Sequence, residues 1–253
     1  MNANALIFDT ASRLNALAAI YQLYDDFAAG LNLACRRGCA HCCTLNVTVT
    51  SLEARYILDQ LAHTNRSALL EQLAGTERNR HLRPQVTTNA MARLCAEGKP
   101  LPEDDNNPAW GRCPFLTEEI CPLYTARPFG CRCLVSTANC STSDFATIDR
   151  FTLTVNTVFL QCIEHLDAGG LSGNLAIMLK HLDDVIRQGP RPHGKPPPEL
   201  ISNNPLTILM IPPEHRDKIA PWLEKLRKAM ILHPPVDVKQ PSNQPQQKVI
   251  ADD

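Results

Sequence analysis

Apolar side chains recur at helical spacing in the first hundred residues. In the first part of this stretch they fall at Leu14, Leu17, Ala18, Tyr21, Ala28 and Leu31. Residues three, four and seven apart share one face of a helix, so the pattern predicts an amphipathic helix over 12–30. The short β-branched stretch LNVTVT (45–50) ends at Thr50, which forms a capping-box signature with Glu53 and predicts a helix over 51–62. A further helix is expected over 85–97.

The pattern over residues 144–188 predicts two helices interrupted at AGGLSG (168–173). Ser143 is the expected N-cap of the first of these helices. Its apolar stripe consists of Phe145, Ile148, Val155, Phe159, Cys162 and Ile163. The strand content expected from the whole chain is low. The fold class is therefore predicted to be mainly α, a helical domain with irregular Cys-rich loops and at most short β-hairpins.

The distribution of proline and cysteine divides the chain. Every cysteine lies between residues 35 and 162, whereas 13 of the 20 prolines follow residue 188. We therefore expect a helical metal-binding domain over 1–189, then a Pro-rich linker with a small appendage over 190–238 and a disordered tail over 239–253. Within the appendage, LTILMI (206–211) predicts a short strand and 214–231 a helix that contains Pro221.

Composition and charge exclude several classes of protein. The 253 residues carry a formal charge of −1, which argues against nucleic-acid or anionic-membrane partners. No apolar run reaches the roughly 18 residues that a membrane span needs, and the N-terminal sequence has no secretory pattern. A cytoplasmic protein is therefore expected. Because cytosolic thiols stay reduced, and because 11 cysteines do not pair evenly, clustered cysteines favour metal binding over disulfides.

The first cysteine segment is LACRRGCAHCC (33–43), which places four thiols within nine residues at Cys35, Cys39, Cys42 and Cys43. The spacing of the first three matches the cluster-binding loop of radical S-adenosylmethionine enzymes. Those enzymes place the loop after a strand of a βα barrel, however, whereas here a helix precedes the loop and helices dominate the rest of the chain. The radical-enzyme interpretation is therefore disfavoured.

The second segment, CPFLTEEICPLYTARPFGCRC (113–133), supplies Cys113, Cys121, Cys131 and Cys133. A turn around Thr117–Glu119 would make Cys113 and Cys121 cross-strand neighbours. Cys131 and Cys133 would point to one side if the chain were extended. Both segments together offer eight thiols, enough for two four-coordinate positions. Adjacent side chains such as Cys42 and Cys43 diverge in helix and strand alike, which favours a cluster or two adjacent sites over one structural zinc.

The stretches CRRGCAHCC, CPFL and CPLYTARPFGCR resemble the cysteine-cluster (CxxCxxCC, YkgJ-like) family of zinc- or iron-chelating proteins. The resemblance covers about residues 35–133 and implies metal binding through these cysteines. The family also includes flagellin lysine methylases that use an iron–sulfur cluster, but nothing else in the chain points to methyl transfer. Cys133 stands where the family has an apolar residue.

The proposed metal ligands are Cys35, Cys39, Cys42, Cys43, Cys113, Cys121, Cys131 and Cys133. Nearby arginines favour thiolates and offset the charge of a four-thiolate centre; they are Arg36, Arg37, Arg112, Arg127 and Arg132. Cys95 and Cys162 are expected in the core, and Cys140 is expected in a loop, where it is a weaker ligand candidate. His41 is a weaker ligand candidate, and the other histidines form no metal-binding pair; these are His63, His81, His165, His181, His193, His215 and His233.

Three functions compete. The first is a protein that holds iron, as an iron–sulfur cluster, through the cysteines. The second is a structural zinc module that binds a protein partner, and the third is metal chelation and delivery. An iron–sulfur-dependent protein-modifying enzyme is a weaker alternative. No Walker loop, nucleophile elbow or dinucleotide fingerprint occurs, and no residue is assigned a catalytic role.

Overall fold

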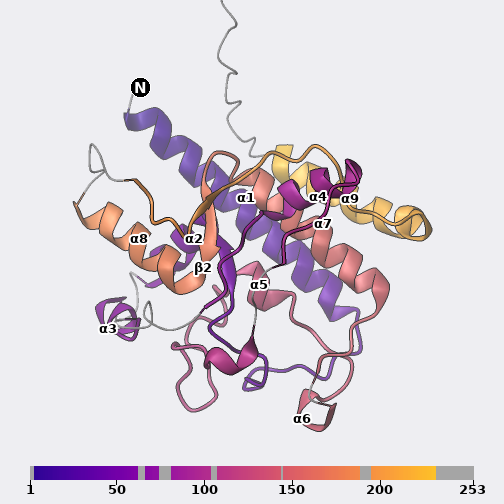
Figure 1. The fold of residues 1–253 in the computed structure, drawn as a ribbon, viewed down its shortest axis with the longest axis horizontal. Helices are drawn as coiled ribbons and strands as arrows, with labels where there is room; N and C mark the ends of the chain where they lie inside the picture. Colours follow the sequence, from indigo (N-terminus) through magenta and orange to yellow (C-terminus); the bar gives the residue numbers. More distant parts are fainter. Residues whose placement is uncertain are drawn as a thin grey trace, which may run out of the picture.

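The computed structural model describes residues 3–61, 66–73, 81–103, 107–143, 145–188 and 195–231. Along the chain the elements are α1 (Ala3–Ala29), β1 (Thr48–Thr50), α2 (Ser51–Leu61), α3 (Arg66–Glu71), α4 (Thr88–Ala96), the 3-10 turn η2 (Pro108–Trp110), α5 (Phe129–Arg132), α6 (Cys140–Ser143), α7 (Arg150–Leu166), β2 (Leu171–Asn174), α8 (Leu175–Gln188), β3 (Ile201–Ser202), the 3-10 turn η3 (Pro213–His215) and α9 (Arg216–Ile231). Helices dominate, and the predicted fold class is confirmed (Figure 1).

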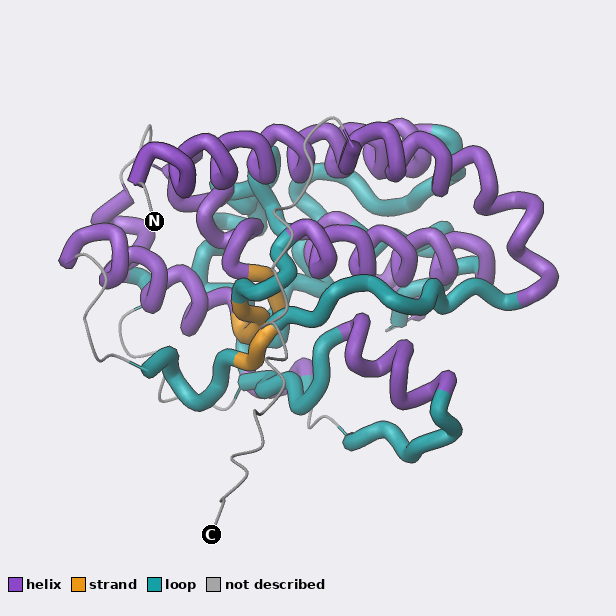
Figure 2. The backbone as a smooth tube through the Cα atoms, turned by 90° about the horizontal axis from the view of Figure 1, so that it is seen from above, coloured by secondary structure: helices purple, strands orange, loops and turns teal. Residues whose placement is uncertain are grey.

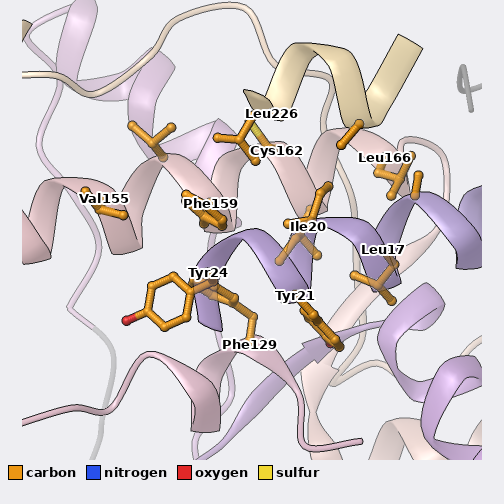
Figure 3. Packing of buried hydrophobic residues seen from close by; sticks show 14 of the residues in the cluster. Leu17, Ile20, Tyr21, Tyr24, Phe129, Val155, Phe159, Cys162, Leu166 and Leu226 are labelled. Carbon is orange, nitrogen blue, oxygen red and sulfur yellow. The ribbon is translucent and has the colours of Figure 1, made fainter. Parts of the chain in front are cut away.

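The larger hydrophobic core forms where α7 and α9 pack against α1. Its centre is an aromatic group from three elements: the ring of Tyr24 lies 4.7 Å from that of Phe129 and 5.4 Å from that of Phe159, between centroids. Figure 3 shows Tyr24 on α1 between these neighbours. Phe129 opens α5, the short helix that carries Cys131. The helical core therefore fixes one end of the second cysteine segment.

A second core lies between α2, α8 and a small antiparallel sheet. The strand order is β1-β2-β3, with Val49 opposite Gly173 and Ser172 opposite Ile201. Figure 2 shows these three short strands in the middle of the molecule, with helices around them. Gly173 leaves room for Leu200, because a Cβ at this position would displace the end of the Leu200 side chain. The strands join segments far apart in sequence, so they are not a hairpin.

The predicted capping box at the start of α2 is present. The Thr50 backbone N–H donates to Glu53 Oε2 at 2.9 Å, and the Glu53 N–H donates to Thr50 Oγ1 at 3.2 Å. The other carboxylate oxygen, Oε1, accepts from the hydroxyl of Tyr21 at 2.9 Å and from the backbone N–H of Phe129 at 2.7 Å. One buried carboxylate therefore joins α1, the start of α2 and α5.

Two expectations about the second half of the chain are wrong. The helix expected from residue 144 begins at Arg150, where the side chain of Asp149 caps it, and Phe145 is exposed outside the helix. Asp149 accepts from the Thr152 N–H at 3.0 Å, a cap in the position that Ser143 was expected to fill. The strand expected at 206–211 is a loop; the paired residues of this region are Ile201–Ser202.

The residues after 195 contact the rest of the molecule through two elements. β3 pairs with β2, and α9 contributes Ile219 and Leu226 to the larger core. The boundary expected at residues 189/190 stays a prediction, and the expected tail at 239–253 lies outside the described residues. Within the described part of the chain, no helix combines the length and the apolar character of a membrane span.

Candidate metal centre

The two cysteine segments meet at one cavity of about 190 Å³. Seven of the eight proposed ligands line it: Cys35, Cys39, Cys42 and Cys43 from the first segment, and Cys113, Cys121 and Cys131 from the second. The segments are held together by backbone hydrogen bonds from Cys113 N to Cys43 O at 3.0 Å and from Leu45 N to Gly111 O at 3.1 Å. In Figure 1 these loops lie on the side of the molecule where α5 and α6 are labelled.

The second segment presents two sulfurs through the same Cys-Pro turn. In Cys113-Pro114-Phe115-Leu116 the Leu116 N–H donates to the Cys113 carbonyl oxygen at 3.2 Å, and in the turn that starts at Cys121 the Tyr124 N–H donates to the Cys121 carbonyl oxygen at 3.2 Å. Burial raises the pKa of both thiols, and the backbone N–H groups of Phe115 and Leu116 at Cys113, and of Leu123 at Cys121, lower it in part. Such N–H groups stabilise a thiolate and tune a bound metal. The turns therefore offset part of the effect of burial on the two thiols.

A tight turn separates Cys113 from Cys121, with a different centre from the one expected. Thr117 and Ile120 exchange backbone hydrogen bonds of 3.0 and 2.8 Å, and the two residues between them have positive φ angles of 49° at Glu118 and 65° at Glu119. The turn is centred between Glu118 and Glu119, so Cys113 and Cys121 are not directly opposite each other. They nevertheless line the same cavity.

The first segment reaches the cavity through two turns. The Cys39 N–H donates to Arg36 O at 2.9 Å, across Gly38 with its φ of +88°, and the Cys43 N–H donates to Ala40 O at 3.1 Å. Cys42 and Cys43 both line the cavity. A hydrogen bond from the Cys42 thiol lowers the pKa of Cys43, and the same bond together with burial raises the pKa of Cys42.

Cys131 and Cys133 face opposite sides, against the expectation that both point one way. The segment is helical, not extended: α5 covers Phe129–Arg132, and residues two apart on a helix are separated by about 200°. Cys131 packs with Cys113 and Cys121 at the edge of the second core, whereas Cys133 packs against the larger core. Burial raises the pKa of Cys133 to about 12. Cys133 does not line the cavity, and its role as a ligand stays a prediction.

Arginines provide positive charge at the cavity wall. Arg127 lies over the ring of Tyr124, 4.0 Å from its centroid, and its buried Nε has no hydrogen-bond partner. Its charge lowers the pKa of Cys42, Cys121 and Cys131 against the opposing effect of burial. The unpaired donor suits an anionic group in the cavity.

The remaining arginines near the cysteines differ in role. Arg132 is buried, pairs with Asp25 at 2.7 Å and lies 4.4 Å from the centroid of Tyr21, so it positions α5 against α1. Arg112 forms a bidentate pair with Glu119 at 2.7 and 2.6 Å at the surface. Arg36 lines the cavity, and Arg37 lies 5.9 Å from the Tyr124 centroid.

Burial keeps most thiols of the cavity protonated in the absence of metal. It raises the pKa of Cys35, Cys113 and Cys121, and it raises that of Cys131 well above the usual thiol range. In the described part of the chain, no three Cys, His, Asp or Glu side chains already stand at the spacing of an ion site. The sulfurs line the wall, so binding would draw them inwards and release their protons.

The cysteines outside the two segments, and the histidines, occupy only some of the positions expected for them. Cys162 is confirmed in the core, whereas Cys95 is exposed on α4 and the core expectation for it is wrong. Cys140 is buried at the start of α6. Of the histidines that the structure describes, none lines the cavity; His63, His193 and His233 lie outside the described residues.

An open cleft of about 580 Å³ adjoins the cavity. Cys39, Cys43 and Glu119 line both, and the cleft adds the exposed His41, Arg112, which pairs with Glu119, and Asn139 and Ser141 on either side of Cys140. The cysteine site therefore has an enclosed side towards α2 and α8 and a side open to solvent.

The donor set fits a thiolate-bound group. Sulfur ligands select zinc and iron–sulfur centres over hard oxygen-seeking cations, and the N–H donors and Arg127 favour negative charge on the sulfurs. Residues 34–151 match the CxxCxxCC family, described as "Putative zinc- or iron-chelating domain". The chain thus carries a domain of the CxxCxxCC family, as its cysteine pattern predicts. Neither a search of curated proteins nor a search of solved structures found a match.

Proposed function

We propose that the cysteine cavity holds iron as an iron–sulfur cluster. The observation that carries this proposal is the number of thiols: seven line one cavity, whereas a structural zinc ion takes four ligands. The cavity of about 190 Å³ is also large against the roughly 10–15 Å³ that one water needs, so it accommodates more than a single ion. A bound cluster would supply one-electron redox chemistry at this position.

The surroundings of the cavity support an anionic, multi-atom group. Backbone N–H donors at Cys113 and Cys121 would remain bonded to the ligating sulfurs, and hydrogen bonds to sulfur are one of the means by which proteins set cluster potentials. The guanidinium of Arg127, with its unpaired Nε, would offset negative charge on the group. The chain's own contribution is thus to bind, enclose and electrostatically balance the metal.

Metal delivery is a second candidate, favoured by the position of Cys39. This thiol is exposed, and it lines both the cavity and the open cleft, so a metal bound there would be within reach of a competing ligand. Delivery predicts that a chelator removes metal within minutes. A group enclosed for redox chemistry predicts slow release.

The test is anaerobic purification followed by visible absorption spectroscopy and assays of iron, zinc and acid-labile sulfide. Brown protein with iron and acid-labile sulfide in similar amounts is expected. Cys162→Ser is the matched control, because Cys162 is buried in the helical core and does not line the cavity. Colourless protein with stoichiometric zinc would contradict the cluster and leave the zinc alternative.

A further inference from the structure

The carboxylates in the wall of the cysteine cavity are already paired. Those that line the cavity belong to Asp25 and Glu119. Arg132 pairs with Asp25 at 2.7 Å, and Arg112 pairs with Glu119 at 2.6 Å. Neither carboxylate is therefore left to balance another positive charge at the cavity.

Three other arginines gather at the same cavity. Arg36 and Arg127 line it, and the exposed Arg37 lies beside Tyr124, which lines it as well. In the described part of the chain, no carboxylate forms an ion pair with any of the three. The guanidinium of Arg127 lies 4.0 Å from the centroid of the Tyr124 ring, and that of Arg37 lies 5.9 Å from it. One aromatic ring thus attracts two like charges, whose mutual repulsion a bound anion would relieve.

Arg127 has hydrogen-bond donors to spare. Its Nε is buried and has no partner among the described residues, and a buried donor left unpaired is costly. A guanidinium carries five N–H donors in a planar fork, which matches the two oxygens of a carboxylate or phosphate. Four thiolates around a zinc ion carry a charge of about −2, so three arginines supply more positive charge than one such centre offsets. Arg127 is therefore able to bind a second anion as well as balance the metal–thiolate group.

Another part of the cavity wall is apolar. It consists of Ala28, Leu33, Leu134 and Val135. Leu134 is 41% exposed, so this apolar part extends to the molecular surface. Sites for small organic molecules typically combine an apolar lining with a few charged or polar groups that fix the orientation of the ligand. The wall therefore suits a molecule with an apolar body and an anionic head.

We infer that the cavity contains a subsite, formed by Arg127, Arg37 and Tyr124, for the carboxylate or phosphate group of a small organic ligand. The inference rests on the proposed metal binding only for what lies beside this ligand, and it adds the chemical class of the ligand. Arg127 and Arg37 bind the anionic head, and the Tyr124 ring positions both guanidinium groups. The exposed Arg36 adds positive charge that attracts the ligand to the cavity.

The test is isothermal titration calorimetry of the anaerobically purified protein with benzoate, phenyl phosphate, benzamide and inorganic phosphate. At least one of benzoate and phenyl phosphate should bind, and the tighter of the two identifies the head group. Benzamide has the same ring without the charge, so it should bind at least about 10-fold more weakly. Inorganic phosphate has no apolar body and should also bind more weakly than the tighter of the two aromatic anions.

Three variants assign the binding to the proposed residues. Arg127→Gln should weaken binding of the tighter probe by at least about 10-fold, the effect of a lost hydrogen bond to a charged group. Arg37→Gln should weaken it by about 2- to 5-fold, because Arg37 is exposed to solvent. Arg227→Gln is the matched control, since Arg227 is an exposed arginine of α9 that lines neither the cavity nor the cleft. Metal content is measured on every sample.

The possible failures are distinguishable. Metal-bearing wild type that bound neither aromatic anion, or bound benzamide equally well, would overturn the subsite and leave the proposed function intact. Wild type without metal would overturn the proposed function, and binding of an aromatic anion by that protein would still support the subsite. Unchanged affinity in Arg127→Gln would contradict the inference. If Arg127→Gln lost its metal, Arg37→Gln would decide, and an affinity equal to that of Arg227→Gln would overturn the subsite.

Discussion

Replacement of Glu53 should loosen the second cysteine segment, because this carboxylate joins the helical core to α5. It accepts hydrogen bonds from the Tyr21 hydroxyl, the Phe129 N–H, the Thr50 N–H and the Thr50 hydroxyl, at 2.9, 2.7, 2.9 and 3.0 Å. Glu53 is 3% exposed, so water does not replace these bonds in the native fold. Phe129 opens the helix that holds Cys131 in the cavity.

The size of the expected loss of stability follows from the hydrogen-bond donors that are left without an acceptor. In Glu53→Ala these are the hydroxyls of Tyr21 and Thr50 and the backbone N–H groups of Thr50 and Phe129, and a buried unsatisfied donor costs about 1–3 kcal/mol. The expected loss is at least about 4 kcal/mol, a large part of a typical stability of about 5–15 kcal/mol. Glu53→Gln keeps one carbonyl oxygen for Tyr21 and Phe129 but turns an NH₂ group towards the Thr50 N–H. It should lose about 1–3 kcal/mol.

The assay is urea unfolding followed by far-ultraviolet circular dichroism, with metal content measured on the same samples. Glu214→Gln is the control, because Glu214 is exposed, and it should change stability by less than about 0.5 kcal/mol. The expected order is wild type, Glu53→Gln, Glu53→Ala, with metal content falling in the same order. A loss below about 1 kcal/mol in Glu53→Ala would refute the reasoning, since the four donors would then have found other partners.

Four further predictions concern Asp167 at the end of α7, Gly130 in α5, the turn at Glu118 and the metal. Burial raises the pKa of Asp167 from 3.8 to about 6, so ionisation of this carboxyl opposes folding. The free energy of unfolding of the wild type, relative to that of Asp167→Asn, should therefore fall by up to about 3 kcal/mol as the pH rises from 4 to 7, measured by urea denaturation at each pH. A Cβ at Gly130 would lie 3.0 Å from the Thr48 carbonyl oxygen, so Gly130→Ala should lower stability by about 1–3 kcal/mol and reduce bound metal, measured by thermal melting and elemental analysis. Asn tolerates the positive φ of residue 118 better than Glu does, so Glu118→Asn should raise stability by about 0.5 kcal/mol in urea unfolding. Metal removal should expose residues 35–43 and 107–143 to limited proteolysis while helical circular dichroism persists; cleavage within α1 or α7 at the same rate would contradict this.

Local signals in the sequence were sufficient to predict α1, α2, α4, α8 and α9, but not the short helices α3, α5 and α6. The Thr50–Glu53 capping box and the apolar spacing at Leu17 and Phe159 act within one or two turns of chain, and each occurs as predicted. The start of α7 was missed because Ser143 and Asp149 are both good caps, and tertiary packing decided between them.

The sequence predicts which cysteines are candidate ligands, but it does not predict how their side chains are arranged in space. Spacing alone does not show whether Cys131-Arg132-Cys133 is extended or helical, and the Phe129 N–H bond to Glu53 helps to fix the helix there. Likewise, the bond from the Ala34 N–H to Ser136 O joins the start of the first cysteine segment to the loop after the second, and the spacing of the cysteines does not predict it. Such long-range contacts carry no sequence signature.

X-ray absorption spectroscopy at the metal edge tests most directly whether thiolates from both cysteine segments hold the metal. The expected nearest shell contains sulfur only, at about 2.3 Å, with an iron–iron shell if the group is a cluster. Cys121→Ser and Cys39→Ser, one from each segment, should both reduce the bound metal, with the Cys162→Ser spectrum unchanged. A nearest shell of nitrogen or oxygen, or full sulfur coordination in both ligand variants, would contradict the account.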